Sequence, residues 1–199
     1  MDIGLESKFY KFANTLYNIM VINFFILLGY FSIIFLGGFQ ATSDYICRKI
    51  ISKEDYKIRL AFRKYFYSNF KKTLVVSIIY IVIFLSFMIS YIEKKSEILF
   101  ILFVYINTFF YIFTFIIGNY ETKVVDGIKN SLSILNLHFY IMIINYGIIK
   151  LILFLLAKNA FLFIILGLGI HKYIMANIIY IVLQKSIINK KEIGLWRNI

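Results

Sequence analysis

The stretch Gly37–Lys72, GGFQATSDYICRKIISKEDYKIRLAFRKYFYSNFKK, is the long polar segment of a 199-residue chain whose remainder consists mainly of apolar runs. It carries nine Lys and Arg against three Asp and Glu. The resulting net charge of +6 is half of the formal +12 of the whole chain. Basic segments beside membrane spans are retained in the cytoplasm. This segment is therefore predicted to be a cytoplasmic loop that sets the orientation of every span.

The composition is typical of a multi-pass membrane protein. Hydrophobic residues make up 61% of the chain and charged residues 16%, whereas soluble domains average about 45–50% and about 25%. Proline is absent, so no proline kink is expected in a span. The single cysteine, Cys47, excludes an intramolecular disulfide and a cysteine metal cluster.

The apolar runs predict an all-α membrane protein with five transmembrane helices and a cytoplasmic amphipathic helix. We expect one membrane domain over residues 1–199, with spans at about 13–36, 73–92, 98–117, 134–156 and 161–183 and a basic helical loop over 37–72. A helix needs about 20 apolar residues to cross the hydrocarbon. With the loop inside, the N-terminus is expected outside and the C-terminus in the cytoplasm. Lys and Arg then number 15 inside and 5 outside.

Within the loop, residues 55–72 are expected to form the amphipathic helix. Apolar side chains recur there at steps of three and four, beside a basic face. Such a helix can lie on the anionic inner leaflet or in a groove of a partner protein. The candidate partner or lipid interface comprises Ile58, Arg59, Phe62, Arg63, Lys64, Phe66 and Phe70.

Several segments together resemble the YesL family of small bacterial integral membrane proteins. They are FYKFANTLYNIMVIN at Phe9–Asn23, QAT at Gln40–Thr42, FRKYFYSNFKKT at Phe62–Thr73 and IKN at Ile128–Asn130. Gln40 stands where that family usually has proline. The family has no assigned function, but its members are typically encoded beside carbohydrate ABC importers. The resemblance therefore implies a bacterial cytoplasmic-membrane location and an accessory or regulatory role with importer permease or ATPase subunits as partners.

Residues that would indicate catalysis are lacking. All ten Asp and Glu fall outside the predicted spans, and the sequence has no zinc-protease, Walker or nucleophile-elbow motif. We expect no enzyme activity, no cofactor, no metal and no nucleic-acid partner; membrane lipids are the expected surroundings. Two further functions remain open: an independent small transporter or channel, and an assembly, immunity or sensing protein with another partner.

The candidate intramembrane polar site comprises Asn145, His171 and Lys172. Lys172 lies about 17 Å into the last predicted span, near the midplane of a roughly 30 Å hydrocarbon core. A charge there is costly, and no acid is predicted within a span. Lys172 is expected either to be neutral or bonded to Asn, Tyr and carbonyl groups of the bundle, or to meet an acid of another subunit or a polar solute.

Overall fold

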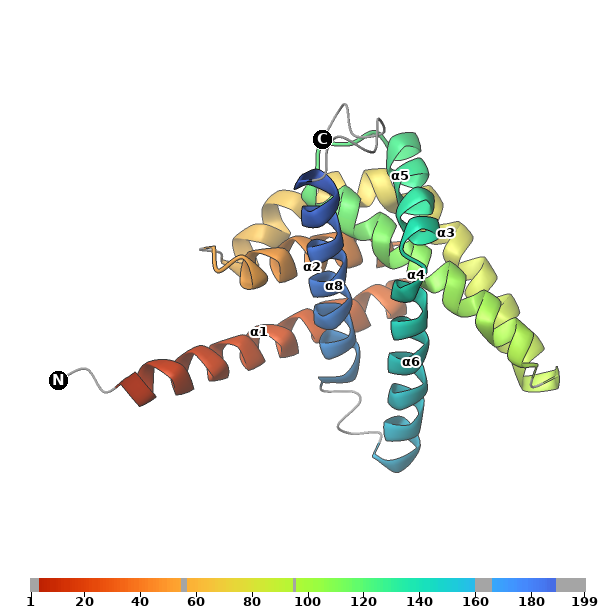
Figure 1. The fold of residues 1–199 in the computed structure, drawn as a ribbon, viewed down its shortest axis with the longest axis horizontal. Coiled ribbons are helices and arrows are strands. Elements are labelled where there is room, and N and C mark those ends of the chain that lie inside the picture. Colours follow the sequence, from red (N-terminus) through yellow and green to blue (C-terminus); the bar gives the residue numbers. More distant parts are fainter. Residues whose placement is uncertain (1–3, 55–56, 95, 160–165, 189–199) are drawn as a thin grey trace.

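A computed structural model describes residues 4–54, 57–94, 96–159 and 166–188. In these ranges the chain is helical and contains no strand (Figure 1). The helices are α1 (Gly4–Ser32), α2 (Leu36–Ile51), α3 (Ile58–Lys94), α4 (Glu97–Asn119), α5 (Val124–Leu137), α6 (Tyr140–Lys158) and α8 (Leu168–Ile188).

Three segments of these helices are long and apolar enough to cross a membrane: Phe12–Ser32, Ile58–Phe87 and Glu97–Asn119. A fourth span results if Val124–Leu137 and Tyr140–Ile152, which meet at a bend of 87°, are counted together. The all-helical membrane class is thus confirmed. Five spans are not reached among the described residues.

Helix α3 joins two elements that the sequence analysis kept apart. The expected amphipathic helix over 55–72 and the expected span over 73–92 form one helix, Ile58–Lys94. Neither glycine nor proline occurs in these 37 residues, so nothing local interrupts the helix. Its length is about 55 Å at 1.5 Å per residue. The basic N-terminal turns of α3 are therefore a rigid extension of a helix that can span the membrane. Residues 55 and 56 lie outside the described part.

The predicted span over 134–156 is also corrected. Its first residues belong to α5, which ends at Leu137, and the chain turns before α6 begins at Tyr140. One face of α5 is buried, and Gly127 lets it approach Phe113 and Ile117 of α4 closely. This packing fixes α5 in a different direction from α6. Of the span predicted over 161–183, residues 161–165 lie outside the described part, and α8 begins at Leu168.

Helix α2 occupies the centre of the bundle, whereas the sequence predicted a basic helical loop in the cytoplasm over residues 37–72. It packs against α1, α3, α4 and α8 (Figure 1). Small residues allow this close packing. A Cβ on Gly37 would meet the Thr73 side chain at 2.6 Å, and one on Gly38 would meet Phe70 at 2.9 Å. Sixteen residues span only about 24 Å, so α2 is a short core helix.

Helices α1 and α2 form an antiparallel hairpin. Gly29 of α1 contacts Leu36 and Phe39, and the ring of Phe25, one turn earlier in α1, lies 5.9 Å from that of Phe39. The connection contains Ile33 with a φ of 53°, a left-handed conformation that is strained for a β-branched residue. The basic C-terminal end of α2 therefore returns toward the N-terminal half of α1.

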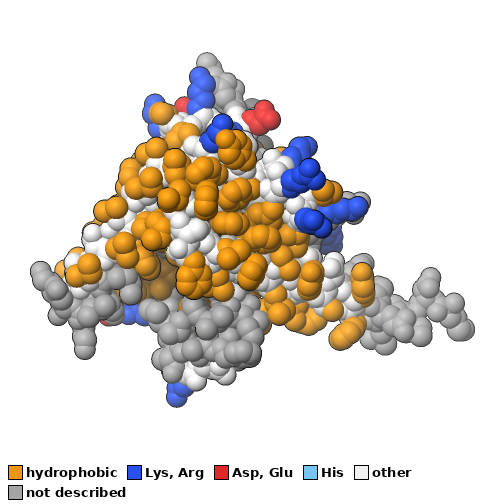
Figure 2. All heavy atoms as spheres, turned by 180° about the vertical axis from the view of Figure 1, so that it is seen from behind, with side chains coloured by type: hydrophobic (Ala, Val, Ile, Leu, Met, Phe, Trp, Pro, Cys, Tyr) orange, Lys and Arg blue, Asp and Glu red, His pale blue; other side chains and the backbone are white. Residues whose placement is uncertain are grey.

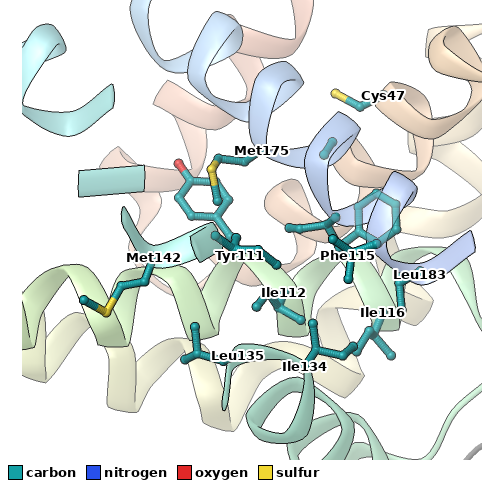
Figure 3. Close-up of a cluster of buried hydrophobic side chains, with 14 of the residues drawn as sticks. Cys47, Tyr111, Ile112, Phe115, Ile116, Ile134, Leu135, Met142, Met175 and Leu183 are labelled. Carbon is teal, nitrogen blue, oxygen red and sulfur yellow. The ribbon is translucent and has the colours of Figure 1, made fainter. Parts of the chain in front are cut away.

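The largest core cluster is centred on α4 and α8. Figure 3 shows Tyr111, Ile112, Phe115 and Ile116 of α4 between Met175 and Leu183 of α8 on one side and Ile134 and Leu135 of α5 on the other. The outer surface is apolar as well. Figure 2 shows hydrophobic side chains over most of one face, with Lys and Arg gathered along its edge. An apolar surface with charges at its rim is what a bilayer accommodates.

Candidate functional site

A buried ion pair joins helix α2 to helix α8. Lys172 of α8 places Nζ 2.7 Å from Oδ2 of Asp44 in α2, and the residues are 0% and 1% exposed. Thr114 of α4 donates its hydroxyl to the same carboxylate oxygen at 2.8 Å. The expectation that this chain offers no carboxylate to compensate Lys172 is therefore wrong. Lys172 is compensated by an acid of its own chain.

Asp44 reaches this position because α2 packs so closely. Asp44 follows Ala41 by one helical step of three, and Ala41 presents its backbone carbonyl to Gly118 of α4, where any side chain would clash. This contact brings Asp44 to Thr114, one turn before Gly118. The ammonium of Lys172 also lies 4.6 Å from the centre of the Tyr111 ring, an attractive cation–π geometry.

A chain of hydrogen bonds continues from Tyr111 through the bundle. The Tyr111 hydroxyl lies 3.3 Å from Nδ1 of His171, and Nε2 of His171 lies 2.7 Å from Oδ1 of Asn145. The Asn145 amide donates to Asn107 Oδ1 at 3.2 Å and to Thr108 Oγ1 at 2.8 Å. The predicted residues Asn145 and His171 are thus in direct contact, and Lys172 is the next residue along α8.

The hydrogen-bond chain ends at two tyrosines near the turn between α1 and α2. Asn107 donates its amide to the hydroxyl of Tyr80 at 2.7 Å. Tyr80 in turn hydrogen-bonds with Tyr30 of α1. Together with the ion pair, these contacts connect α1, α2, α3, α4, α6 and α8.

The hydrogen atoms of this chain are fixed in one direction. The Thr108 hydroxyl donates to the Val104 carbonyl at 2.7 Å, so it can only accept from Asn145. The Asn145 oxygen must then accept from His171, which places the imidazole proton on Nε2 and leaves Nδ1 to accept from Tyr111. Every group donates toward Tyr30.

This direction limits what the site can do chemically. A proton relay needs groups that accept a proton on one side and release one on the other. Asn145 and Asn107 use amide nitrogens as donors, and an amide does not exchange protons in this way at neutral pH. The hydrogen-bond chain therefore serves to hold the helices together. An average interhelical hydrogen bond in a membrane stabilises by about 0.6 kcal/mol.

Four polar atoms on α2 are buried without a hydrogen-bond partner among the described residues: Gln40 Oε1, Ser43 Oγ, Asp44 Oδ1 and Arg48 Nε. Each such atom costs roughly 1–3 kcal/mol. Burial of α2 therefore costs free energy that packing against the neighbouring helices must offset.

The structure divides the candidate partner or lipid interface into two faces. The Phe62 ring stacks on Phe25 with centroids 3.8 Å apart, Phe66 lies 4.7 Å from Phe39, and Phe70 lies 5.1 Å from Phe35. Ile58 is half-buried. The aromatic stripe thus packs against α1, α2 and their connection. Its rings are buried or half-buried by these contacts, and Phe62 with Ile58 borders a groove beside α1.

The basic members of that set, unlike the aromatic ones, extend into solvent. Arg59, Arg63 and Lys64 are exposed, as is Tyr67 one turn farther on. Cys47 is a buried free thiol. Among the described residues, no three His, Cys, Asp or Glu side chains are grouped so that they could hold a metal ion.

Asp44 and Thr114 are the residues that sequence reasoning missed. A signal was present in the spacing, because Gly37 and Ala41 form a small-xxx-small pair typical of helix packing in membranes. Asp44 continues that face. Comparison of the chain with protein-family models, curated proteins and solved structures found no match.

Proposed function

We propose that this protein is an accessory or regulatory membrane subunit that binds its partner through the exposed basic face of α3. The resemblance to the YesL family supports a carbohydrate ABC importer, through its permease or ATPase subunits, as the partner. The observation that carries the docking role is the continuity of α3. A basic face on a rigid extension of a spanning helix is held at a fixed height beside the membrane.

Such a face suits a protein partner because little conformational entropy is lost on binding. The aromatic side of the same turns is locked against α1 and α2, so Arg63 and Lys64 project from an already ordered helix. Pre-organisation lowers the entropy cost of association. Basic side chains at an interface rim speed and orient encounter with an acidic surface.

The alternative of an independent transporter has less support. Its best candidate path, the buried polar chain, is interrupted by two carboxamides and closed by an ion pair. A role in assembly, immunity or sensing with another partner would use the same basic face. The identity of the proteins that bind it distinguishes this role from an importer role.

The proposed orientation places the basic ends of α2 and α3 in the cytoplasm, following the positive-inside rule. The α1–α2 hairpin favours an N-terminus on that same side, in contrast to the expectation from the sequence. Single cysteines replacing Lys53, Tyr10 or Lys158 in a Cys47→Ser chain test this. Labelling of intact cells should reach position 158 only. Labelling at position 10 would restore the N-out arrangement.

The docking proposal is tested by affinity purification from bacterial membranes in mild detergent. Importer subunits should accompany the wild-type chain, and Arg63→Gln/Lys64→Gln should reduce their recovery at least several-fold. Lys123→Gln/Lys129→Gln, on the exposed part of α5, makes the same charge change elsewhere and should leave recovery intact. Equal recovery with both double variants would refute docking through α3. Recovery of unrelated proteins would refute the importer role.

A further inference from the structure

A groove of about 580 Å³ runs between the N-terminal half of α1 and the start of α3. Its walls include Asn14 and Tyr17 of α1, Arg59 of α3, and Glu54 and Lys57 of the connection before α3. The volume lies within the range of about 300–1,000 Å³ that is usual for small-molecule sites. The buried polar chain takes no part in it.

The groove changes from polar to apolar along its length. Asn14 and the charged connection supply polar lining at the N-terminal ends of the two walls, whereas Val21, Phe25 and Phe62 come one to three turns farther along their helices. The stacked rings of Phe25 and Phe62 line this apolar end. Both walls belong to helices that are able to span a membrane. A groove with this polarity fits an amphiphile that has a polar head and a hydrocarbon chain.

The charges at the polar end favour an anionic head. Glu54 is already occupied, since it forms ion pairs with Lys49 and Arg48. Hydrogen bonds from Lys49 and Ser52 lower the pKa of Glu54 below its ordinary value of 4.5, so this carboxylate stays ionised. Lys57 and Arg59 form no ion pair with any carboxylate in the described ranges.

We infer that this groove binds an anionic phospholipid of the inner leaflet. Lys57 and Arg59 contact the phosphate, the Asn14 carboxamide donates to a head-group oxygen, and an acyl chain lies along Val21, Phe25 and Phe62. Arginine and lysine are the usual protein ligands of phosphate groups. A bound lipid would fill the space between α1 and α3 on the side where the two basic helix ends emerge.

Native mass spectrometry of the full chain, released from detergent with added phosphatidylglycerol or phosphatidylcholine, tests this inference. Wild-type protein should retain phosphatidylglycerol preferentially. Two basic residues beside an anionic surface correspond to about a 30-fold preference. Lys57→Gln/Arg59→Gln should abolish that preference, whereas Arg63→Gln/Lys64→Gln, with the same charge change outside the groove, should keep it within about threefold of wild type.

Two further arms separate the lipid from other sources of the same chemistry. Val21→Trp should fill the apolar end and reduce retention of both lipids, with helicity and elution volume as folding controls. Millimolar inorganic phosphate should not displace phosphatidylglycerol. Three results would overturn the inference. Displacement of phosphatidylglycerol by phosphate would indicate an ion site, and an equal loss of lipid preference in both charge variants would indicate non-specific surface attraction. Lipid retention that Val21→Trp leaves unchanged would place the lipid elsewhere.

Discussion

Replacing Lys172 with methionine should destabilise this protein severely, because it leaves Asp44 buried without its countercharge. At 2.7 Å, the attraction between the two charges is about 6 kcal/mol at an effective dielectric constant of about 20. The desolvation of each ion, several kcal/mol, offsets most of this gain. The pair is therefore close to neutral as a whole, whereas loss of one member costs about 3–5 kcal/mol.

The assay is thermal unfolding of the purified protein in mild detergent. A loss of about 3–5 kcal/mol lowers the Tm by roughly 6–20 °C for a chain of this size. Lys150→Met is the matched control, since Lys150 pairs with Glu97 at 3.3 Å where both side chains are substantially exposed. An exposed pair contributes about 0–1 kcal/mol, so this variant should lose little.

The double variant Asp44→Asn/Lys172→Met tests whether the cost comes from the stranded charge. It removes both charges and retains an oxygen that can accept from Thr114. We expect it to recover most of the stability lost by Lys172→Met. A double variant as unstable as the sum of the two single ones would refute this reasoning, as would a Lys172→Met protein that unfolds with wild-type Tm.

Three other substitutions test the packing and the hydrogen-bond chain by the same unfolding assay. Gly37→Ala should lower the free energy of unfolding by about 1–3 kcal/mol because its new Cβ meets Thr73 at 2.6 Å. Gly147→Ala, with open space around it, should leave stability unchanged or raise it by up to about 1 kcal/mol. Equal effects of the two variants would contradict the close approach of α2. Asn145→Leu should cost about 1–3 kcal/mol because His171, Asn107 and Thr108 each lose one hydrogen bond. An unchanged Tm would show that the hydrogen-bond chain does not stabilise the fold. Ile33→Gly should stabilise by about 1 kcal/mol through relief of its φ of 53°, and a lower Tm would contradict the strain.

Hydropathy and helix periodicity were sufficient to predict much of this fold. The span expected over 98–117 corresponds to α4, and most of the span expected over 13–36 lies in α1. Both are long apolar runs, for which a helix is the only structure that satisfies the backbone in hydrocarbon. The all-helical class follows from the same constraint.

A short helix was expected within residues 37–72, but the burial of α2 in the bundle could not be recognised in this way because its polar residues are typical of an exposed segment. Asp44 and Thr42 are hydrophilic by any scale, yet both are buried. Thr42 accepts a hydrogen bond from Asn69. The burial of Asp44 depends on Thr114 and Lys172, which lie 70 and 128 residues away from it along the chain. Composition and local periodicity carry no information about such distant pairing.

The candidate polar site was predicted in part. Lys172 stood out because a lone lysine deep in an apolar run needs compensation, and that argument correctly indicated a partner. It offered Asn, Tyr and carbonyl groups of the bundle, an acid of another subunit or a polar solute as that partner, and did not consider Asp44 because α2 was expected in the cytoplasm. The contact of Asn145 with His171 depends on how α6 and α8 are rotated about their axes, which small differences in packing decide.

The separation of 128 residues between Asp44 and Lys172 also sets a delay during synthesis of the protein. At a synthesis rate of about 5–20 residues per second, Lys172 leaves the ribosome roughly 6–26 s after Asp44. Through that interval the membrane holds a nascent bundle whose central helix carries an unneutralised acid. Arrival of α8 completes the pair, so a product that ends before α8 would keep an acid in the bundle without its countercharge.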